Sequence, residues 1–159
     1  GTLEKPYTIE KNGKTYTFFP TICLEGIYSY LFAEFEKFNP DFYINITNDS
    51  WYDKTYETTH HLYLTALRSA ETRKMIFRSA TTGISGIVNN IGQVEKKLLP
   101  LTEGLIFSYV KTYDKQTFYS KVGYKIMTFG HWFAWGLVLF GYILYIISLF
   151  RPKISKISN

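Results

Sequence analysis

The chain has 159 residues, a formal net charge of +5 and one cysteine, Cys23. With 46% hydrophobic and 19% aromatic residues, it is long and apolar enough for one domain with a substantial core. The single cysteine excludes an intrachain disulfide framework, and three histidines add too few ligands for a structural zinc site. Basic residues form no block, so we expect no nucleic-acid partner, whereas a modest basic excess suits an anionic membrane surface. We also expect no metal and no cofactor.

The first half of the chain predicts strands separated by a helix. Residues 14–22 are β-branched and aromatic, which is typical of a strand. Apolar residues near helical spacing over residues 24–38 predict a helix, which Asn39-Pro40 ends. A second strand is expected over residues 41–47, followed by the polar loop "NDSWYD".

The next elements continue this alternation. A long helix is expected from Tyr56 to Met75, then strands over residues 76–81 and 84–90. A turn at residues 90–92 leads into "QVEKKLL", and a last strand is expected over residues 105–111. This order predicts an α/β domain covering residues 1–125.

The C-terminal segment predicts a transmembrane helix over residues 126–150. Residues 129–150 carry no formal charge, and at about 1.5 Å per residue they reach roughly 33 Å, enough to cross a hydrocarbon core. Two of its aromatic residues, Trp132 and Trp135, lie near one end, as interfacial residues do. The alternative is a buried core helix. A basic tail follows over residues 151–159, and three basic residues flank each end of the span, so charge does not set its orientation.

Cys23 stands where a predicted strand passes into a predicted helix. Such a turn projects a side chain from the sheet edge, and a helix N-terminus favours a thiolate and an oxyanion. Cys23 is therefore a candidate nucleophile; the alternative is an ordinary buried thiol.

Motifs around Cys23 resemble the apolipoprotein N-acyltransferases of the carbon–nitrogen hydrolase (nitrilase) superfamily. The order and spacing of the matching segments, together with the trailing apolar span, carry the resemblance over roughly residues 13–150. The matching segments are "ICLE" at 22–25, "NITNDSW" at 45–51, "RSAETRK" at 68–74, "RSATTGIS" at 78–85 and "EGL" at 103–105.

The resemblance implies part of an α-β-β-α sandwich with a Glu–Lys–Cys triad, followed by one transmembrane helix. Cys23 would take a fatty acyl group from a phospholipid as a thioester and pass it to the N-terminal amine of a lipid-modified cysteine in an apolipoprotein. Glu25 matches a supporting acid beside the nucleophile. The implied location is the bacterial inner membrane, with the catalytic part periplasmic and the C-terminus cytoplasmic.

Only 22 residues precede Cys23, and they hold no match to the Glu and Lys of the family. We therefore expect a fragment completed by an N-terminal half that supplies both groups. Without that half, apolar inner-face residues should be exposed; these are Phe18, Ile22, Ile44, Ile46, Ile87 and Val88.

Four further residues are candidates for lining the active site. Asn48, Asp49 and Trp51 follow the second strand, where simple turn chemistry is the alternative, and Arg78 could equally be a structural ion-pair partner. Two other functions stay open: a membrane-tethered nitrilase-type amidase and a non-catalytic, membrane-anchored interaction module.

Overall fold

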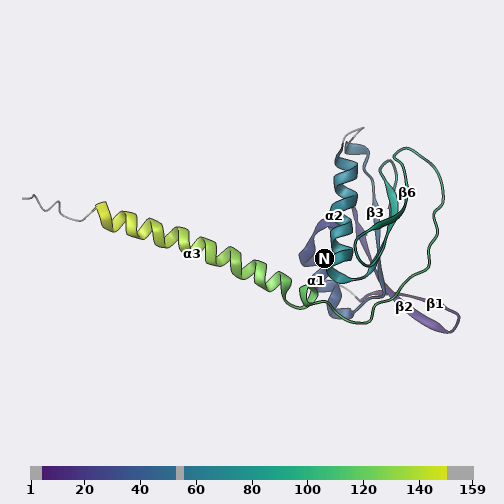
Figure 1. The fold of residues 1–159 in the computed structure, drawn as a ribbon, viewed down its shortest axis with the longest axis horizontal. Helices are drawn as coiled ribbons and strands as arrows, with labels where there is room; N and C mark the ends of the chain where they lie inside the picture. The colour runs from purple at the N-terminus through teal and green to yellow at the C-terminus, as the bar shows by residue number, and fades with distance from the viewer. Residues whose placement is uncertain (1–4, 53–55, 150–159) are drawn as a thin grey trace, which may run out of the picture. The chain divides into compact units, whose positions relative to one another are not determined.

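A computed structural model describes residues 5–52 and 56–149. The chain divides into two compact units between Tyr124 and Lys125. The first unit contains a six-stranded sheet in which the strands lie side by side in sequence order, from β1 to β6 (Figure 1). The predicted mixed α/β class is confirmed.

Three central strands of the sheet are parallel. β2 pairs in parallel with β3, and β3 with β4, while β1, β5 and β6 join by antiparallel pairing. Parallel neighbours need a crossover connection, which helical segments supply here. The strands are β1 (Tyr7–Lys11), β2 (Lys14–Ile22), β3 (Phe42–Thr47), β4 (Met75–Ala80), β5 (Ser85–Val88) and β6 (Val94–Leu98).

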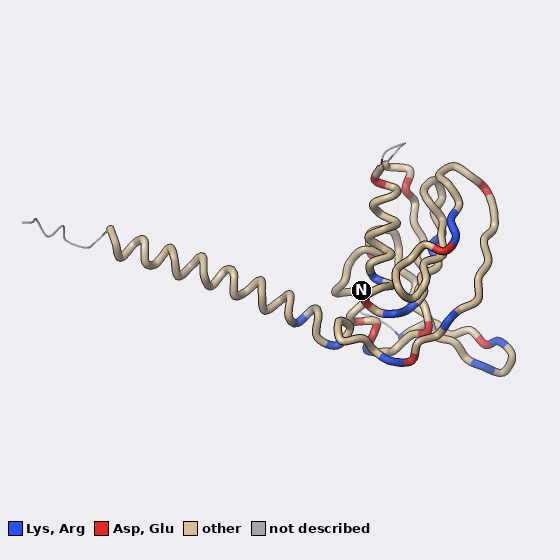
Figure 2. The backbone as a smooth tube through the Cα atoms, viewed as in Figure 1, with Lys and Arg blue, Asp and Glu red and all other residues tan. Residues whose placement is uncertain are grey.

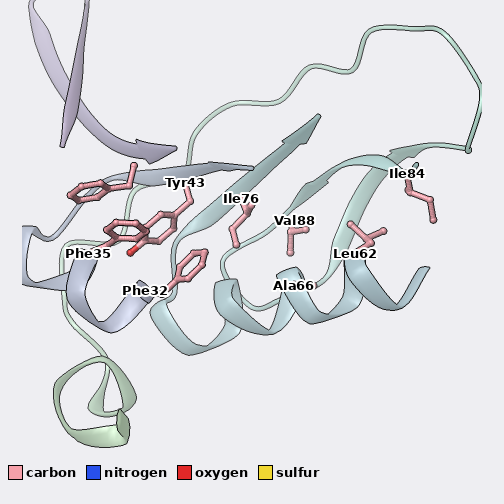
Figure 3. Packing of buried hydrophobic residues seen from close by; sticks show 9 residues of the cluster. Phe32, Phe35, Tyr43, Leu62, Ala66, Ile76, Ile84 and Val88 are labelled. Atoms are coloured by element: carbon pink, nitrogen blue, oxygen red, sulfur yellow. The ribbon is translucent and has the colours of Figure 1, made fainter. Parts of the chain in front are cut away.

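The helices of the two crossovers pack on one face of the sheet. α1 (Ser29–Phe35) lies between two 3-10 turns, η1 (Cys23–Ile27) and η2 (Glu36–Phe38), and connects β2 to β3. α2 (Glu57–Thr72) connects β3 to β4 after a third 3-10 turn, η3 (Ser50–Tyr52). Figure 3 shows the core between these helices and the sheet. Its labelled members are Phe32, Phe35, Tyr43, Leu62, Ala66, Ile76, Ile84 and Val88.

The strand register divides the helix-facing side of the sheet into an apolar row and a polar row. Phe19, Tyr43, Ile76 and Val88 are aligned across β2 to β5 and are all buried. Side chains alternate along a strand, so the row two residues further on faces the same helices. That row consists of three polar residues, Thr21, Asn45 and Arg78, and of Gly86, which has no side chain.

Two predicted helices have different limits in the structure. The helix expected over residues 24–38 is interrupted at Tyr28, whose ψ of 106° is extended. The long helix ends at Thr72 because Arg73 adopts a left-handed conformation with φ of 61° and donates its N–H to Ser69. Met75 consequently belongs to β4. The strand β1 was not predicted; it forms a hairpin with β2 through Asn12 and Gly13, both at positive φ.

The strand predicted over residues 105–111 is wrong. Among the described residues, 104–110 form no backbone–backbone hydrogen bond, so this segment has strand-like alternation without a pairing partner. Ile106 and Val110 pack on the side of the sheet away from the helices, against Phe42, Met75 and Ile87.

The expected exposure of the inner face is correct for only part of the set. Val88 is fully buried because it faces the helices, and Ile87 is buried in the cluster that Ile106 and Val110 join. Ile22 and Ile46 are 67% and 54% exposed. Phe18 and Ile44 are half-buried. Of the six residues, only Ile22 and Ile46, at the carboxyl end of the parallel strands, are exposed.

The second unit is the helix α3 (Tyr124–Leu149), preceded by the π-helical turn η4 (Tyr119–Gly123). From Ile126 onward α3 carries no Lys, Arg, Asp or Glu, as Figure 2 shows. Its length and composition suffice to cross a membrane. The predicted end of the span at Phe150 and the basic tail over residues 151–159 lie outside the described residues.

The chain leading to η4 is fixed to the amino ends of the parallel strands. Lys74, just before β4, donates to the carbonyl oxygen of Tyr113 and, at 3.0 Å, to Asn39. Gln116 donates to the carbonyl oxygen of Glu36. Cys23 lies at the opposite, carboxyl end of β2.

Candidate functional site

Cys23 occupies a sharp backbone turn directly after β2. Its φ of 51° places it in the left-handed region, which costs a non-glycine residue about 1–2 kcal/mol. The expected α-helix N-terminus directly behind Cys23 is wrong, because the five-residue 3-10 turn η1 comes first and α1 begins at Ser29. Glu25 stabilises this turn, since its Oε2 accepts the N–H of Ile22 at 2.8 Å.

The carboxyl ends of the three parallel strands bring several candidate residues to one edge of the sheet. Cys23 follows β2, Asp49 follows β3 by two residues, and Gly83 follows β4 by three. In open α/β sheets this edge is where ligands bind. The topology therefore joins segments that are far apart in sequence.

A buried ion pair lies beneath the Cys23 turn. Arg78 Nη2 lies 2.8 Å from Asp49 Oδ2, and both side chains are fully buried. Arg78 also donates to Asn45 Oδ1 at 2.5 Å and to the carbonyl oxygen of Ile84 at 3.2 Å. Burial lowers the pKa of Arg78, and Asp49 opposes that shift. Removing one partner of such a pair costs about 3–5 kcal/mol.

Gly83 leaves the space that Asp49 occupies. A Cβ atom at position 83 would lie 2.0 Å from Asp49 Oδ2. The "TTGIS" segment therefore needs glycine here because the buried carboxylate packs directly on its backbone.

His61 connects Asp49 to the Cys23 turn. Its Nδ1 lies 3.0 Å from Asp49 Oδ1, and its Nε2 lies 3.4 Å from the carbonyl oxygen of Cys23. Burial and, secondly, the charge of Arg78 lower the pKa of His61, against the opposite effect of Asp49. His61 was not among the residues predicted for the site. Its spacing of four residues from Thr65 and eight from Ser69, both buried, was the signal for an inward-facing position.

The other predicted lining residues lie on the surface. Asn48 is exposed and accepts the N–H of Ser50 at 3.1 Å, which is ordinary turn chemistry. Trp51 is 87% exposed. The structure thus gathers Cys23, Asp49 and Arg78 in one cluster, and adds Asn45 and His61.

Fold and site together define an α/β protein with a cysteine at the carboxyl edge of its parallel strands, joined to an apolar helix long enough to cross a membrane. No family model matches the chain. It is 36% identical over 121 residues to an apolipoprotein N-acyltransferase of Bdellovibrio bacteriovorus, covering 74% of this chain and 20% of that protein. It is 34% identical over 151 residues to apolipoprotein N-acyltransferase 2 of Leptospira interrogans, covering 92% of this chain and 24% of that protein.

A third relative extends the match over almost the whole chain. The apolipoprotein N-acyltransferase of Haemophilus ducreyi is 28% identical over 157 residues, which cover 98% of this chain. The chain is a homologue of the apolipoprotein N-acyltransferases, which confirms the resemblance. It spans only 20% to 28% of the length of these three relatives.

Proposed function

We propose that this chain is the C-terminal, nucleophile-bearing part of an apolipoprotein N-acyltransferase. The observation that carries the proposal is the left-handed turn of Cys23 at the carboxyl edge of the parallel strands, in a chain whose relatives bear this name. Cys23 is half-buried, so its thiol is neither fully enclosed nor fully exposed.

The chemistry proceeds in two steps, formation of a thioester on Cys23 and transfer of the acyl group to an amine. The Cys23 thiolate attacks the ester carbonyl of a phospholipid; a C–S bond forms, the C–O bond breaks, and the lysophospholipid leaves with a proton from a general acid. The amine of the apolipoprotein's N-terminal cysteine then attacks the thioester; a C–N bond forms, the C–S bond breaks, and the thiol is regenerated. A thiol suits both steps because its thiolate attacks esters readily and its thioester still reacts with amines.

The base and the cation for these steps come from an N-terminal half. Of the acids and bases near Cys23, Glu25 is held by the Ile22 N–H and His61 by Asp49. Neither is placed as a free general base. A glutamate from the N-terminal half deprotonates the thiol, and a lysine supports the oxyanion.

The same half covers the open face of the sheet. Ile22 and Ile46 are exposed there, and a groove of about 270 Å³ lies further along, between Ile44, Phe77 and Ile106. The unpaired segment 104–110 crosses this face. These features support a second sheet that completes a nitrilase-like sandwich, with residues 1–125 as its C-terminal part.

The apolar helix anchors the enzyme in the bacterial inner membrane. Residues 126–150 form the span, the catalytic part lies in the periplasm, and the tail at 151–159 lies in the cytoplasm. The anchor keeps the enzyme on the membrane that holds both substrates, since the phospholipid and the lipid-modified apolipoprotein are both in the bilayer.

The test is acylation of Cys23 measured by intact mass. The full chain is purified in detergent, combined with the preceding region of the Leptospira interrogans relative, and incubated with phospholipid. A fatty-acyl mass increase on Cys23 that disappears with an amine acceptor supports the proposal. The full-length relative serves as the positive control; if it is acylated under these conditions and Cys23 is not, the proposal is wrong.

The same protein preparation, incubated with a small amide or with phospholipid, separates the two alternative functions. Release of ammonia from a small amide, without an acyl adduct, identifies an amidase. Stable association with the added region, without turnover of either substrate, identifies an interaction module.

A further inference from the structure

The Cys23 turn is held through its carbonyl oxygen. Asn45 Nδ2 donates to this oxygen at 3.2 Å, and the side chain of Asn45 is fully buried. The same amide nitrogen lies 3.0 Å from Thr21 Oγ1, on the strand that leads into Cys23. Asn45 therefore contacts both the end of β2 and the residue that follows it.

Arg78 determines which way the Asn45 amide points. A guanidinium can only donate hydrogen bonds, so the atom that faces Arg78 Nη1 at 2.5 Å must be the amide oxygen. The NH₂ group is thereby directed at Cys23. Arg78 is in turn fixed by Asp49, and the orientation of the amide follows from the buried ion pair.

Gly26 provides the room for this arrangement. A Cβ atom at position 26 would lie 2.6 Å from Asn45 Nδ2 and 3.3 Å from Thr65 Oγ1. The turn η1 can close over the Asn45 amide because its fourth residue has no side chain.

We propose that Asn45 is a positioning residue for Cys23: its amide, oriented by Arg78 and admitted by Gly26, holds the Cys23 carbonyl and keeps the thiol-bearing residue in its left-handed turn. This inference rests on the proposed role of Cys23 as the nucleophile. Asn45 touches no reacting atom; it acts through the backbone of Cys23.

The single cysteine makes the proposal directly measurable. Carbonyl-¹³C cysteine, incorporated into the full chain, gives one protein resonance from one site. A buried carbonyl that loses a hydrogen-bond donor resonates further upfield, so the signal of the folded wild type is the reference for the folded variants.

Asn45→Asp is the first variant. Aspartate keeps the shape and an oxygen for Arg78, but presents an acceptor instead of a donor to the Cys23 carbonyl. The resonance should move upfield, and in the completed enzyme Cys23 acylation should slow several-fold. The control is Thr47→Val on the same strand, which removes one buried hydrogen bond to Asp49 but none to Cys23.

Gly26→Ala perturbs the same contact with Asn45 intact, and it decides the outcome if Asn45→Asp does not fold. Its methyl group should displace the amide and shift the resonance in the same direction. If the folded variants leave the resonance where the wild type has it, Asn45 has only a general structural role. The carbonyl measurement needs no acyl donor, so failure of this proposal and failure of acyl transfer are separate results.

Discussion

In the part of the chain that the structure describes, the hydrogen bonds to Cys23 from Asn45 and His61 reach its carbonyl oxygen. Cys23→Ser is therefore expected to fold like the wild type, since serine is nearly the same size and the carbonyl contacts remain. A hydroxyl is a much weaker nucleophile than a thiolate without a strong base, so the completed enzyme should lose acyl transfer. Intact mass and circular dichroism check the two halves of this prediction; turnover like that of the wild type would remove Cys23 from the chemistry.

The buried carboxylate of Asp49 makes Gly83 sensitive to the smallest side chain. Gly83→Ala should destabilise the first unit by about 3–5 kcal/mol, because the methyl group must displace Asp49 from Arg78. Urea unfolding measures the change. Gly104→Ala is the matched control, since its Cβ would meet only the flexible tip of Leu98, at 3.1 Å. Equal stability of the two variants would show that the Asp49–Arg78 pair tolerates displacement.

His61 should make stability fall in mild acid. The folded state lowers the pKa of His61, chiefly through burial, so the unfolded chain binds the proton more readily. Acidification from about pH 6.5, the ordinary histidine value, through the lowered pKa of the folded state therefore favours unfolding. His61→Gln removes this contribution.

The measurement is the difference in urea midpoint between wild type and His61→Gln from pH 8 to pH 5. Taking the difference cancels contributions from other groups, among them Glu36, whose pKa is raised by burial. The difference should be constant above about pH 6.5 and change below it. A difference that stays constant throughout would mean that His61 titrates alike in both states.

At the scale of elements, the strands that pair in the centre of the sheet were predictable and the surface segments were not. β2, β3 and β4 have continuous β-branched or aromatic runs, and their predicted limits are within one residue of the observed ones. Residues 105–111 are also rich in apolar and aromatic residues, but among the described residues no strand pairs with them. Strand pairing depends on neighbours that the local sequence pattern does not reveal. The break at Tyr28 has a comparable cause, because η1 closes over Asn45 through Gly26 and so prevents one continuous helix.

The site was predicted at the level of motifs and not of contacts. Cys23, Asp49 and Arg78 were candidates from their segments, but the sequence did not distinguish a buried pair from a lining residue. Asn45 was noted only as the first residue of the "NITNDSW" motif. Its role depends on the register that aligns it with Thr21 and Arg78, which no local pattern specifies.

α3 permits a direct test of orientation. Lys115, Lys121 and Lys125 precede the span, and Arg151, Lys153 and Lys156 follow it, so the positive-inside rule is balanced. We predict from the family that the C-terminus is cytoplasmic. A reporter that is active only in the periplasm, fused after Asn159, should stay inactive, while the same reporter fused before Lys5 should be active. The reverse pattern would place the Cys23 unit in the cytoplasm.

For the whole molecule, the open face of the sheet predicts a response to the proposed N-terminal half. An added N-terminal half should cover Ile22 and Ile46, which are exposed in this chain, and place a base and a cation near Cys23. The cation stabilises the thiolate and the base accepts the thiol proton, so alkylation of Cys23 at neutral pH should become faster on complementation. Binding of a hydrophobic dye should fall in parallel.

Two results would contradict this prediction. One is a chain that alone is monomeric in detergent, shows no dye binding and already reacts rapidly at Cys23. The other is an added half that binds without changing either signal. Cys23→Ser corrects for reaction at other nucleophiles.

The sequential strand order has a consequence for how the protein is made. Each strand from β2 to β6 pairs with the one synthesised just before it, so none of these strands has to wait for a distant later segment to fill a gap in the sheet. Short-range pairing of this kind favours rapid folding, and domains tend to fold in the order of synthesis. The sheet can therefore grow from one edge as the chain emerges, and the Cys23 turn is closed over Asn45 and Arg78 once β4 and α2 are in place, before the apolar helix has been synthesised.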